Sequence, residues 1–329
     1  MIGAQIAGLG IALPETELTN AELAPRLGVT EEWIVERTGI HCRRIASEGQ
    51  DASSLGIEAS LRALEDADIT GEDIDLIVCA TVTPRWRFPA TACLIQNALG
   101  ARSAAFDLNA GCSGWLYALV QADAVIRSGG ARRALVVGAD VLSRITDYSD
   151  PKSSILFGDG AGAVVVERCD GGPRLGPFSL HSDGSRPQLL FVPNDTGVIH
   201  MAGRDVYRAA VSGMVSSVTE LLGSSGIASA DVDLLVAHQA NKRILDAVAS
   251  RLGIDADRIV SNIAAYGNTS AASIPIALFD ARRSGLLRQD NLVVMTAFGA
   301  GFAWGAGLAR WGTNVPAPRT LVTAGEANV

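Results

Sequence analysis

Residues 106–119 read FDLNAGCSGWLYAL, a stretch that leaves a strand, turns through small residues and enters a helix. After the turn, apolar residues recur at helical spacing, at Trp115, Ala118 and Leu119. The apolar helix face begins just after Cys112, which places this thiol at a helix N-terminus. Unpaired backbone N–H groups and the positive end of the helix dipole favour a thiolate there. We predict that Cys112 is a nucleophile; the alternative is one more small buried residue of the core.

Length and composition are typical of an α/β enzyme. The 329 residues suffice for one large domain or two of ordinary size. Hydrophobic residues make up 48% and charged residues 19%, which excludes disordered and fibrous classes, and the 35 glycines suit a fold with many tight turns. A net charge of −8 disfavours binding of nucleic acid or of an anionic membrane by the protein as a whole.

The cysteines and the N-terminus predict a protein of the reducing cytoplasm. The five cysteines form no CxxC or Cys/His ligand pattern, so no metal site is expected, and their odd number argues against a disulfide framework; they lie at positions 42, 79, 93, 112 and 169. The N-terminus lacks the basic start and apolar stretch of a signal peptide. No later run approaches the roughly 18 apolar residues of a membrane span.

The sequence repeats one plan twice. IDLIVCATVT at 74–83 parallels VDLLVAHQAN at 232–241, and in each case a helix ending in Leu-Gly follows. A strand and a turn of small residues that opens a helix come next, and a further strand closes each unit, ALVVGAD at 134–140 and NLVVMTAFGAG at 291–301. The repeat predicts an α/β fold of two pseudo-symmetric, βαβ-rich halves, with parallel sheets and helices on both faces.

The repeat also predicts the division of the chain. We expect an N-terminal half at 1–170 that carries the cysteine, a C-terminal half at 171–311, and an extension at 312–329, which has two prolines and little periodicity. The two halves are expected to share one continuous core.

Three polar side chains fall at or just after strand ends of this repeat. Cys112 lies in the first half, whereas His238 and Asn268 lie in the second. Ligands bind at strand ends in open α/β sheets, so we expect the halves to meet there and to form a site. A histidine near a cysteine assists nucleophilic catalysis. The alternative for Asn268 is an ordinary helix N-cap.

Seven stretches, in this order, resemble the β-ketoacyl-acyl carrier protein synthase III family of the thiolase superfamily: EEWIVERTGIHCRRIA, FPATACLIQ, AGCSGWLYAL, LFGDGAGAVV, HQANKRI, YGNTSAASIP and AFGAGFAWG. The resemblance runs from about Ile6 to Trp311. It implies a thiolase-like fold in an α/β/α/β/α arrangement. It also implies an acyltransferase that is loaded from acyl-CoA and then condenses the acyl group with malonyl-acyl carrier protein, giving β-ketoacyl-acyl carrier protein, CoA and CO2.

The resemblance gives the three polar residues their roles. Cys112 is the nucleophile, and His238 and Asn268 bind the malonyl thioester carbonyl and stabilise the enolate left when CO2 departs. Two neutral donors in a dry pocket suit that charge. The backbone N–H groups of Cys112 and Gly301 are implied as the oxyanion hole. No cofactor is implied, since acyl-CoA and malonyl-acyl carrier protein are substrates.

The resemblance further implies a binding site for CoA. Trp33 corresponds to a residue that stacks on the adenine, Arg37 to one that contacts the nucleotide, and Asn241 to one that contacts pantetheine. Lys152 stands where the family commonly has an arginine, and a lysine cannot stack as a flat guanidinium does. The alternative for Trp33 and Arg37 is an aromatic ring packed beneath a snorkelling arginine.

Two more groups of residues follow from the resemblance. Phe88 and its neighbour Trp86 are implied at the wall of the acyl pocket, where the family often supplies the residue across a homodimer. Arg243 and Arg251 are implied as a patch that meets the acidic carrier protein; the alternative is a solvated helix face.

The sequence supports other functions less well than it supports a synthase. A thiolase needs a second cysteine near the last glycine loop, and 298–305 has none. The glycine-rich GDGAG at 158–162 precedes a strand and opens no helix, which disfavours a dinucleotide site. A non-catalytic partner subunit would not need Cys112, His238 and Asn268. The main alternative is a starter-unit ketosynthase of polyketide or other secondary metabolism, or a related acyltransferase, with an unusual acyl substrate or acceptor.

Overall fold

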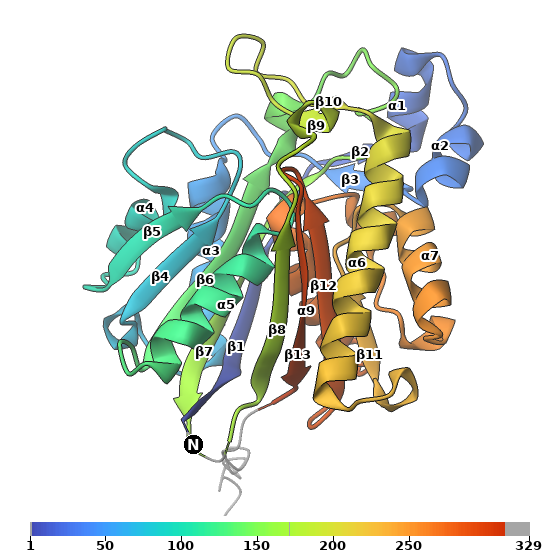
Figure 1. Cartoon of the computed structure of the whole chain (residues 1–329). Helices are drawn as coiled ribbons and strands as arrows, with labels where there is room; N and C mark the ends of the chain where they lie inside the picture. Colours follow the sequence, from blue (N-terminus) through green and yellow to red (C-terminus); the bar gives the residue numbers. More distant parts are fainter. Residues whose placement is uncertain (1, 171, 313–329) are drawn as a thin grey trace, which may run out of the picture.

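A computed structural model of the protein describes residues 2–170 and 172–312, and it contains two main sheets (Figure 1). The strands of the first sheet have the order β1-β7-β6-β4-β5, with β1 at Gly3–Ala12, β7 at Asp159–Cys169, β6 at Arg133–Val141, β4 at Leu76–Ala80 and β5 at Ala104–Leu108. The second sheet has the order β11-β12-β13-β8, with β11 at Leu234–Ala237, β12 at Leu292–Gly299, β13 at Ala303–Arg310 and β8 at Leu175–Ser182. The strands of the first sheet all precede residue 170, and those of the second all follow it.

Both sheets are mixed, so the prediction of parallel sheets was only partly right. Strand β4 runs parallel to β5 and β6, but β7 is antiparallel to β6 and to β1. In the second sheet, β11 runs parallel to β12, and β13 is antiparallel to β12 and β8. No α-helix separates β6 from β7 or β12 from β13, and without a crossover helix consecutive strands pair antiparallel.

The two sheets repeat each other except at one edge. Strands β4, β6, β7 and β1 correspond in order and direction to β11, β12, β13 and β8. The second-half counterpart of β5 is reduced to a single parallel bridge between Leu235 and Ile259. The chain enters α8 at Ile263–Tyr266 shortly after that bridge, which leaves no length for a full strand.

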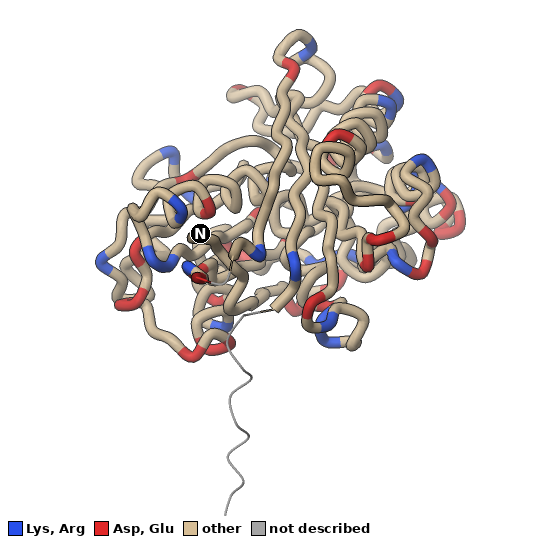
Figure 2. The backbone as a smooth tube through the Cα atoms, turned by 60° about the horizontal axis from the view of Figure 1, so that its bottom comes forward, with Lys and Arg blue, Asp and Glu red and all other residues tan. Residues whose placement is uncertain are grey.

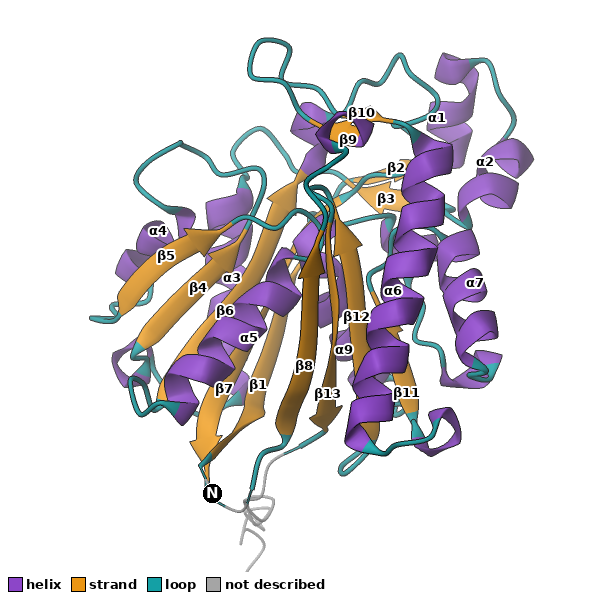
Figure 3. Ribbon diagram, in the orientation of Figure 1, coloured by secondary structure: helices purple, strands orange, loops and turns teal. Residues whose placement is uncertain are grey.

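Helices form three layers around the sheets, which gives the expected α/β/α/β/α order (Figures 1 and 3). Helices α5 (Gly114–Arg127) and α9 (Ser273–Arg283) lie between the sheets. Helices α3 (Ala52–Asp66) and α4 (Thr91–Ala98) cover the outer face of the first sheet, and α6 (Gly203–Ser225) and α7 (Lys242–Leu252) cover that of the second.

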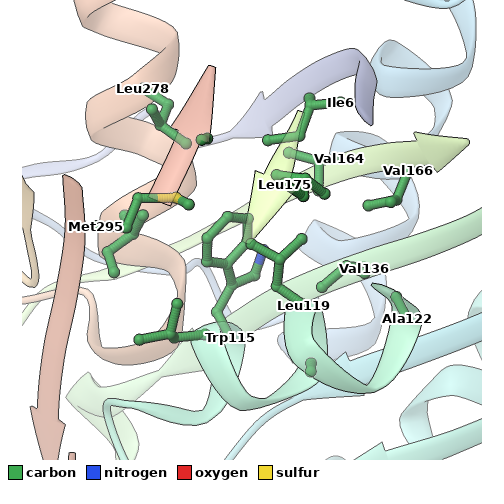
Figure 4. Close-up of a cluster of buried hydrophobic side chains, with 14 of the residues drawn as sticks. Ile6, Trp115, Leu119, Ala122, Val136, Val164, Val166, Leu175, Leu278 and Met295 are labelled. Carbon is green, nitrogen blue, oxygen red and sulfur yellow. The ribbon is translucent and has the colours of Figure 1, made fainter. Parts of the chain in front are cut away.

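The middle layer contains the core that the two halves share. Trp115 of α5 is almost fully buried and packs in one cluster with Val136 and Val164 of the first sheet and with Met295 and Leu278 of the second half (Figure 4). Truncation of such a side chain to alanine costs about 3–5 kcal/mol. The start of α5, and with it Cys112, is therefore fixed by packing on both sides.

A smaller unit lies beside the second sheet at one end of the molecule. It consists of β2 (Glu17–Thr19), α1 (Asn20–Leu27), α2 (Glu31–Thr38) and β3 (Cys42–Arg44). The Thr19 and Glu22 side chains form the capping box that begins α1. The unit packs against the core of the second half and brings α2 next to α7. The short strands β9 (Leu190–Phe191) and β10 (His200–Met201) lie at the same end.

The surface of the protein carries charges of both signs. Acidic and basic residues are interspersed along the outer helices and loops (Figure 2). Among the described residues, no helix combines the length and the apolar character that crossing a bilayer requires. Apart from Gly312, the extension expected at 312–329 lies outside the described residues.

Candidate active site

One cavity of about 930 Å³ brings the three predicted polar residues together. Cys112 from the first half lines it with His238 and Asn268 from the second. The cavity runs from these buried or half-buried side chains to exposed residues such as Arg37 and Lys152. A ligand that enters from solvent therefore has a continuous path to the thiol.

Cys112 sits where β5 turns into α5, as the sequence predicted. Ser113 is the N-cap residue of α5, and its hydroxyl donates to the carbonyl oxygen of Ala110 at 2.6 Å. The second half of the chain is in close contact with this turn at Gly299. A Cβ added at Gly299 would lie 2.5 Å from the backbone nitrogen of Cys112, which is too close for any side chain. Glycine is needed at 299 so that the loops of both halves meet at the nucleophile.

The prediction that the helix N-terminus makes Cys112 a thiolate was wrong for the resting protein. Burial raises the pKa of the Cys112 thiol to about 11, and the nearby Asp140 carboxylate also raises it, while the Ser270 hydroxyl lowers it. Desolvation of the charged form outweighs the helix end here. The resting thiol is protonated at neutral pH, and its ionisation must be assisted during reaction.

His238 follows β11 and is held as a neutral imidazole. Burial lowers the pKa of the His238 ring to about 3. Its Nδ1 lies 2.7 Å from the hydroxyl oxygen of Ser273, which in turn accepts the backbone N–H of Gln239 at 3.4 Å. The Ser273 proton is thus available for Nδ1, which leaves the ring proton on Nε2. The described residues give Nε2 no partner, so it can donate into the cavity.

Asn268 presents a second donor. Its Oδ1 accepts the backbone N–H of Ser270 at 2.9 Å, and this bond fixes the orientation of the amide. The Nδ2 group has no hydrogen-bond partner among the described residues. Asn268 does not cap α9, whose N-cap residue is Ala272, so the helix-cap alternative does not hold. The site holds one thiol and two neutral N–H donors.

The structure does not place Gly301 in the cavity. Gly301 is exposed, and the residues of that turn that line the cavity are Gly299 and Ala300. Ala300 packs against the nucleophile turn, since a Cβ added at Gly111 would lie 2.6 Å from the Ala300 nitrogen. The pattern AFGAGFAWG therefore indicated the turn that reaches the cavity, but not which of its residues line it.

The residues expected to bind CoA line the outer part of the cavity: Trp33, Arg37, Lys152 and Asn241. The Arg37 guanidinium lies 4.1 Å from the centre of the Trp33 ring, so the stacked-arginine alternative holds as well. The Asn241 amide donates to the carbonyl oxygen of Arg37 at 3.0 Å and caps α7. This bond ties α2 to α7.

The mouth of the cavity is strongly basic. Four exposed cations line it, at Arg37, Lys152, Arg204 and Arg243, and no Asp or Glu lines it among the described residues. This is notable in a protein with a net charge of −8. Arg204 could not be predicted as a site residue, because an arginine in the first turn of a long amphipathic helix resembles any other exposed helix residue.

Apolar residues from several elements form the inner walls, and none of them could be predicted as a wall residue from the sequence. They include Leu142, Ile155, Phe157, Met214 and Phe298. Their spacing is that of ordinary core residues, and only the fold shows that they surround a cavity. No group of three or more His, Cys, Asp or Glu side chains within 2–170 and 172–312 is arranged to hold a metal ion.

Besides Gly301, three predicted residues lie outside the cavity. Phe88 is 85% exposed and Trp86 is 47% exposed, and neither lines the acyl walls of its own chain. Arg251 is exposed at the end of α7, whereas Arg243 near the start of that helix lines the mouth.

Family models and similar proteins point to the same family of synthases. The family model described as 3-oxoacyl-(acyl-carrier-protein) synthase III matches residues 106–184, and the model of its C terminal part matches residues 222–311. The beta-ketoacyl-(acyl-carrier-protein) synthase III of Erythrobacter litoralis is 48% identical over 321 residues, which cover 94% of this chain and 100% of the relative. The enzyme of that name from Rhodospirillum rubrum is 48% identical, with 93% and 98% covered.

Solved structures resemble this chain over nearly its full length. The 3-oxoacyl-(acyl-carrier-protein) synthase III of Aquifex aeolicus has a TM-score of 0.92 at 44% identity, covering 94% of this chain and 100% of that one. A priming β-ketosynthase from a polyketide biosynthetic pathway has a TM-score of 0.90 at 36% identity, covering 94% and 96%.

Proposed function

The chain belongs to the 3-oxoacyl-(acyl-carrier-protein) synthase III family, and we propose from this premise that Cys112 carries the acyl group in a decarboxylative condensation. The substrates are an acyl-CoA and malonyl-acyl carrier protein. The observation that carries the proposal is the shared cavity, in which one thiol from the first half faces two unpartnered N–H donors from the second.

In the first step the acyl group moves from CoA to the enzyme. The Cys112 sulfur attacks the acyl carbonyl, the carbon–sulfur bond to CoA breaks, and the CoA sulfur leaves with the proton that the thiol loses. Backbone N–H groups at the nucleophile turn stabilise the tetrahedral oxyanion. Cys112 supplies one of them, and Ala300, rather than Gly301, is the second donor that we propose from the cavity lining.

In the second step the enolate forms between His238 and Asn268. The malonyl carboxylate leaves as CO2, and its bonding electrons place negative charge on the thioester oxygen. The Nε2–H of His238 and the Nδ2–H of Asn268 stabilise that charge in a water-poor site. The enolate carbon then attacks the acyl-cysteine carbonyl, the new carbon–carbon bond forms, and Cys112 leaves as a thiolate that is reprotonated.

The basic mouth suits CoA, whose nucleotide carries several phosphate charges. Arg37, Lys152, Arg204 and Arg243 surround the outer cavity without an opposing carboxylate. The Trp33 ring offers a face for the adenine once Arg37 moves from it to a phosphate. Asn241 reaches the pantetheine arm near the α2–α7 contact.

The carrier protein and a second copy of the chain are the proposed protein partners. Arg243 lines the mouth near the start of α7, and Arg251 is exposed at the other end of that helix, so an acidic carrier protein that presents its prosthetic arm at the mouth could contact both along α7. Phe88, Trp86 and Phe106 are exposed at or near β5, an edge strand that pairs only with β4. A homodimer that covers this edge would bury them and bring Phe88 toward the partner's acyl pocket. The five free cysteines suit a cytoplasmic enzyme.

The alternative is a priming ketosynthase of polyketide biosynthesis, and the likeness to such an enzyme at 36% identity supports it. Both functions use the same loading step. A screen of acyl-CoA donors, read first by the mass of the loaded enzyme and then by the product with malonyl-acyl carrier protein, separates them. Loading without condensation would favour transfer of the acyl group to another acceptor.

The proposal is tested on the two steps separately. Cys112→Ala should give no acyl adduct by intact mass after mixing with an acyl-CoA, and an unchanged adduct would refute the nucleophile assignment. His238→Ala and Asn268→Ala should still be loaded but should release CO2 from malonyl-acyl carrier protein at least about a hundredfold more slowly. Undiminished release would remove the role of these two donors.

A further inference from the structure

Ser270 has a strained backbone next to the nucleophile. Its φ is +51°, in the left-handed region, and only two other described non-glycine residues share a positive φ, Asp68 and Asp290. Those two are exposed, whereas Ser270 is completely buried. Residues other than glycine rarely adopt such a conformation, and it persists only where the surroundings hold it.

Two side chains from different halves hold this turn. The backbone N–H of Ser270 donates to Asn268 Oδ1 at 2.9 Å, and that of Ala271 donates to Asp140 Oδ2 at 3.3 Å. The turn also presses against β6, because a Cβ added at Gly138 would lie 2.4 Å from the Ala271 oxygen. The strain therefore serves to place the Ser270 side chain in the cavity that Cys112 lines.

The Ser270 hydroxyl belongs to the same cavity lining as Cys112 and directly precedes the Ala271 N–H that Asp140 binds. Its oxygen is buried and makes no hydrogen bond of good geometry to the described residues. It nevertheless lies close enough to the Cys112 thiol and to the Asp140 carboxyl to lower the pKa of both groups. A buried hydroxyl without a fixed partner can donate its hydrogen bond to either of two neighbouring acceptors.

Asp140 is built to anchor such a hydroxyl. It is completely buried, and within the described part of the chain it forms no ion pair. Its Oδ1 accepts four donors from Thr81, Val82 and Thr83, at 2.8–3.2 Å. Its Oδ2 accepts only the N–H of Ala271 from the described backbone, which leaves lone pairs on the side of Ser270.

We propose that the Ser270 hydroxyl is a hydrogen-bond donor with two alternative acceptors: the Asp140 carboxylate while Cys112 is a thiol or thioester, and the Cys112 sulfur while it is a thiolate. Ser270 is thus a further catalytic residue, and Asp140 is its positioning residue. His238 is not available for this task, because the proposed function assigns its free N–H to the malonyl carbonyl. The meaning of Ser270 for catalysis rests on the proposed function, in which the thiolate forms once on loading and once on release of the product.

The test follows the ionisation of Cys112 without any acyl substrate. The full-length chain is alkylated with iodoacetamide between pH 6 and pH 10, and modification of the Cys112 peptide is followed by mass. Ser270→Gly removes the hydroxyl and suits the positive φ, so it should fold at least as stably as the wild type. We expect its alkylation to be about tenfold slower at each pH of this range, as for loss of one hydrogen bond to a charged group.

The control is Ser153→Ala. Ser153 also has a buried hydroxyl without a partner, but it does not line the cavity, so its variant should match the wild type. An unchanged alkylation rate in Ser270→Gly would overturn the proposal, as would a similar slowing in Ser153→Ala. Failure of the wild type to take an acyl group from acyl-CoA would instead refute the proposed function and leave this alkylation result unaffected.

Discussion

The Nδ1 atom of His238 lies 2.7 Å from the hydroxyl oxygen of Ser273. Ser273 is the first residue of α9, a helix of the middle layer that is packed between the sheets. The imidazole is therefore oriented by a rigid element, and the tautomer that donates into the cavity is set by a side chain that touches no substrate. Such supporting residues commonly matter almost as much as the group they orient.

We expect Ser273→Ala to impair condensation but not loading. Without the hydroxyl, the ring proton can move to Nδ1, and Nε2 then meets the thioester oxygen as an acceptor instead of a donor. CO2 release from malonyl-acyl carrier protein should fall by about tenfold to a hundredfold, as measured with pre-acylated enzyme. The rate of acyl-adduct formation, followed by intact mass, should stay within about twofold. An equal loss in both steps would indicate a general disturbance of the site rather than a tautomer effect.

Arg204→Glu should weaken binding of acyl-CoA without abolishing chemistry. The change replaces one of the four cations by a carboxylate at a mouth that has none, so the KM for acyl-CoA should rise by about tenfold while kcat changes little. Because exposed charges are screened by salt, the effect should shrink as ionic strength increases. Arg208→Glu is the matched control, since Arg208 is exposed on the same helix but does not line the cavity. Equal effects of the two variants would count against a specific role for Arg204.

The reactive residues could be predicted because each is a chemically distinct side chain at a repeated strand end. Cys112, His238 and Asn268 are reactive or polar side chains among small and apolar neighbours. The internal repeat predicts that their strand ends face each other. The same logic did not hold for Gly301, which does not line the cavity, because backbone donors cannot be recognised from the sequence. Which N–H points inward depends on the turn between β12 and β13, and only the fold determines that turn.

Properties that depend on how deeply the fold buries a residue, such as the pKa of a thiol, could not be predicted from the sequence. The helix N-terminus at Cys112 predicted a thiolate, but desolvation depends on how far the turn sinks between the halves, and it raises the pKa instead. Phe157 and Met214 look like any core residue until the cavity is seen beside them. The antiparallel β7 and β13 were missed because apolar strand runs do not specify direction.

Phe88→Asp should disrupt the proposed homodimer. A charge at this 85% exposed ring would be buried without a partner across the interface, so the dimer fraction should fall in sedimentation velocity. Acyl loading should slow as well, because the pocket loses a wall from the other copy. Leu61→Asp is the control, an exposed leucine on α3 whose change should leave the mass in solution unaltered. A wild type that is monomeric throughout, or a Phe88 variant that stays dimeric, would rule out the interface.

The buried imidazole predicts a loss of stability on acidification. The pKa of His238 is about 3 in the folded protein, against an ordinary value of 6.5. Above pH 6.5 the ring is neutral in both states and adds no pH dependence. As the pH falls below 6.5, the unfolded chain binds a proton that the folded chain does not, so the free energy of unfolding decreases until about pH 3. At pH 5 this single group should remove about 2 kcal/mol.

The measurement is urea unfolding of the wild type and of His238→Asn at pH 7 and pH 5, at one fixed protein concentration. Asparagine keeps an amide near Ser273 but does not titrate in this range, so any constant cost of the substitution cancels between the two pH values. The wild type should lose about 2 kcal/mol more than the variant on going from pH 7 to pH 5. Other groups titrate equally in both proteins and also cancel. Identical losses would mean that the His238 ring accepts a proton in the folded protein, and a neutral imidazole donor at the enolate would then be untenable.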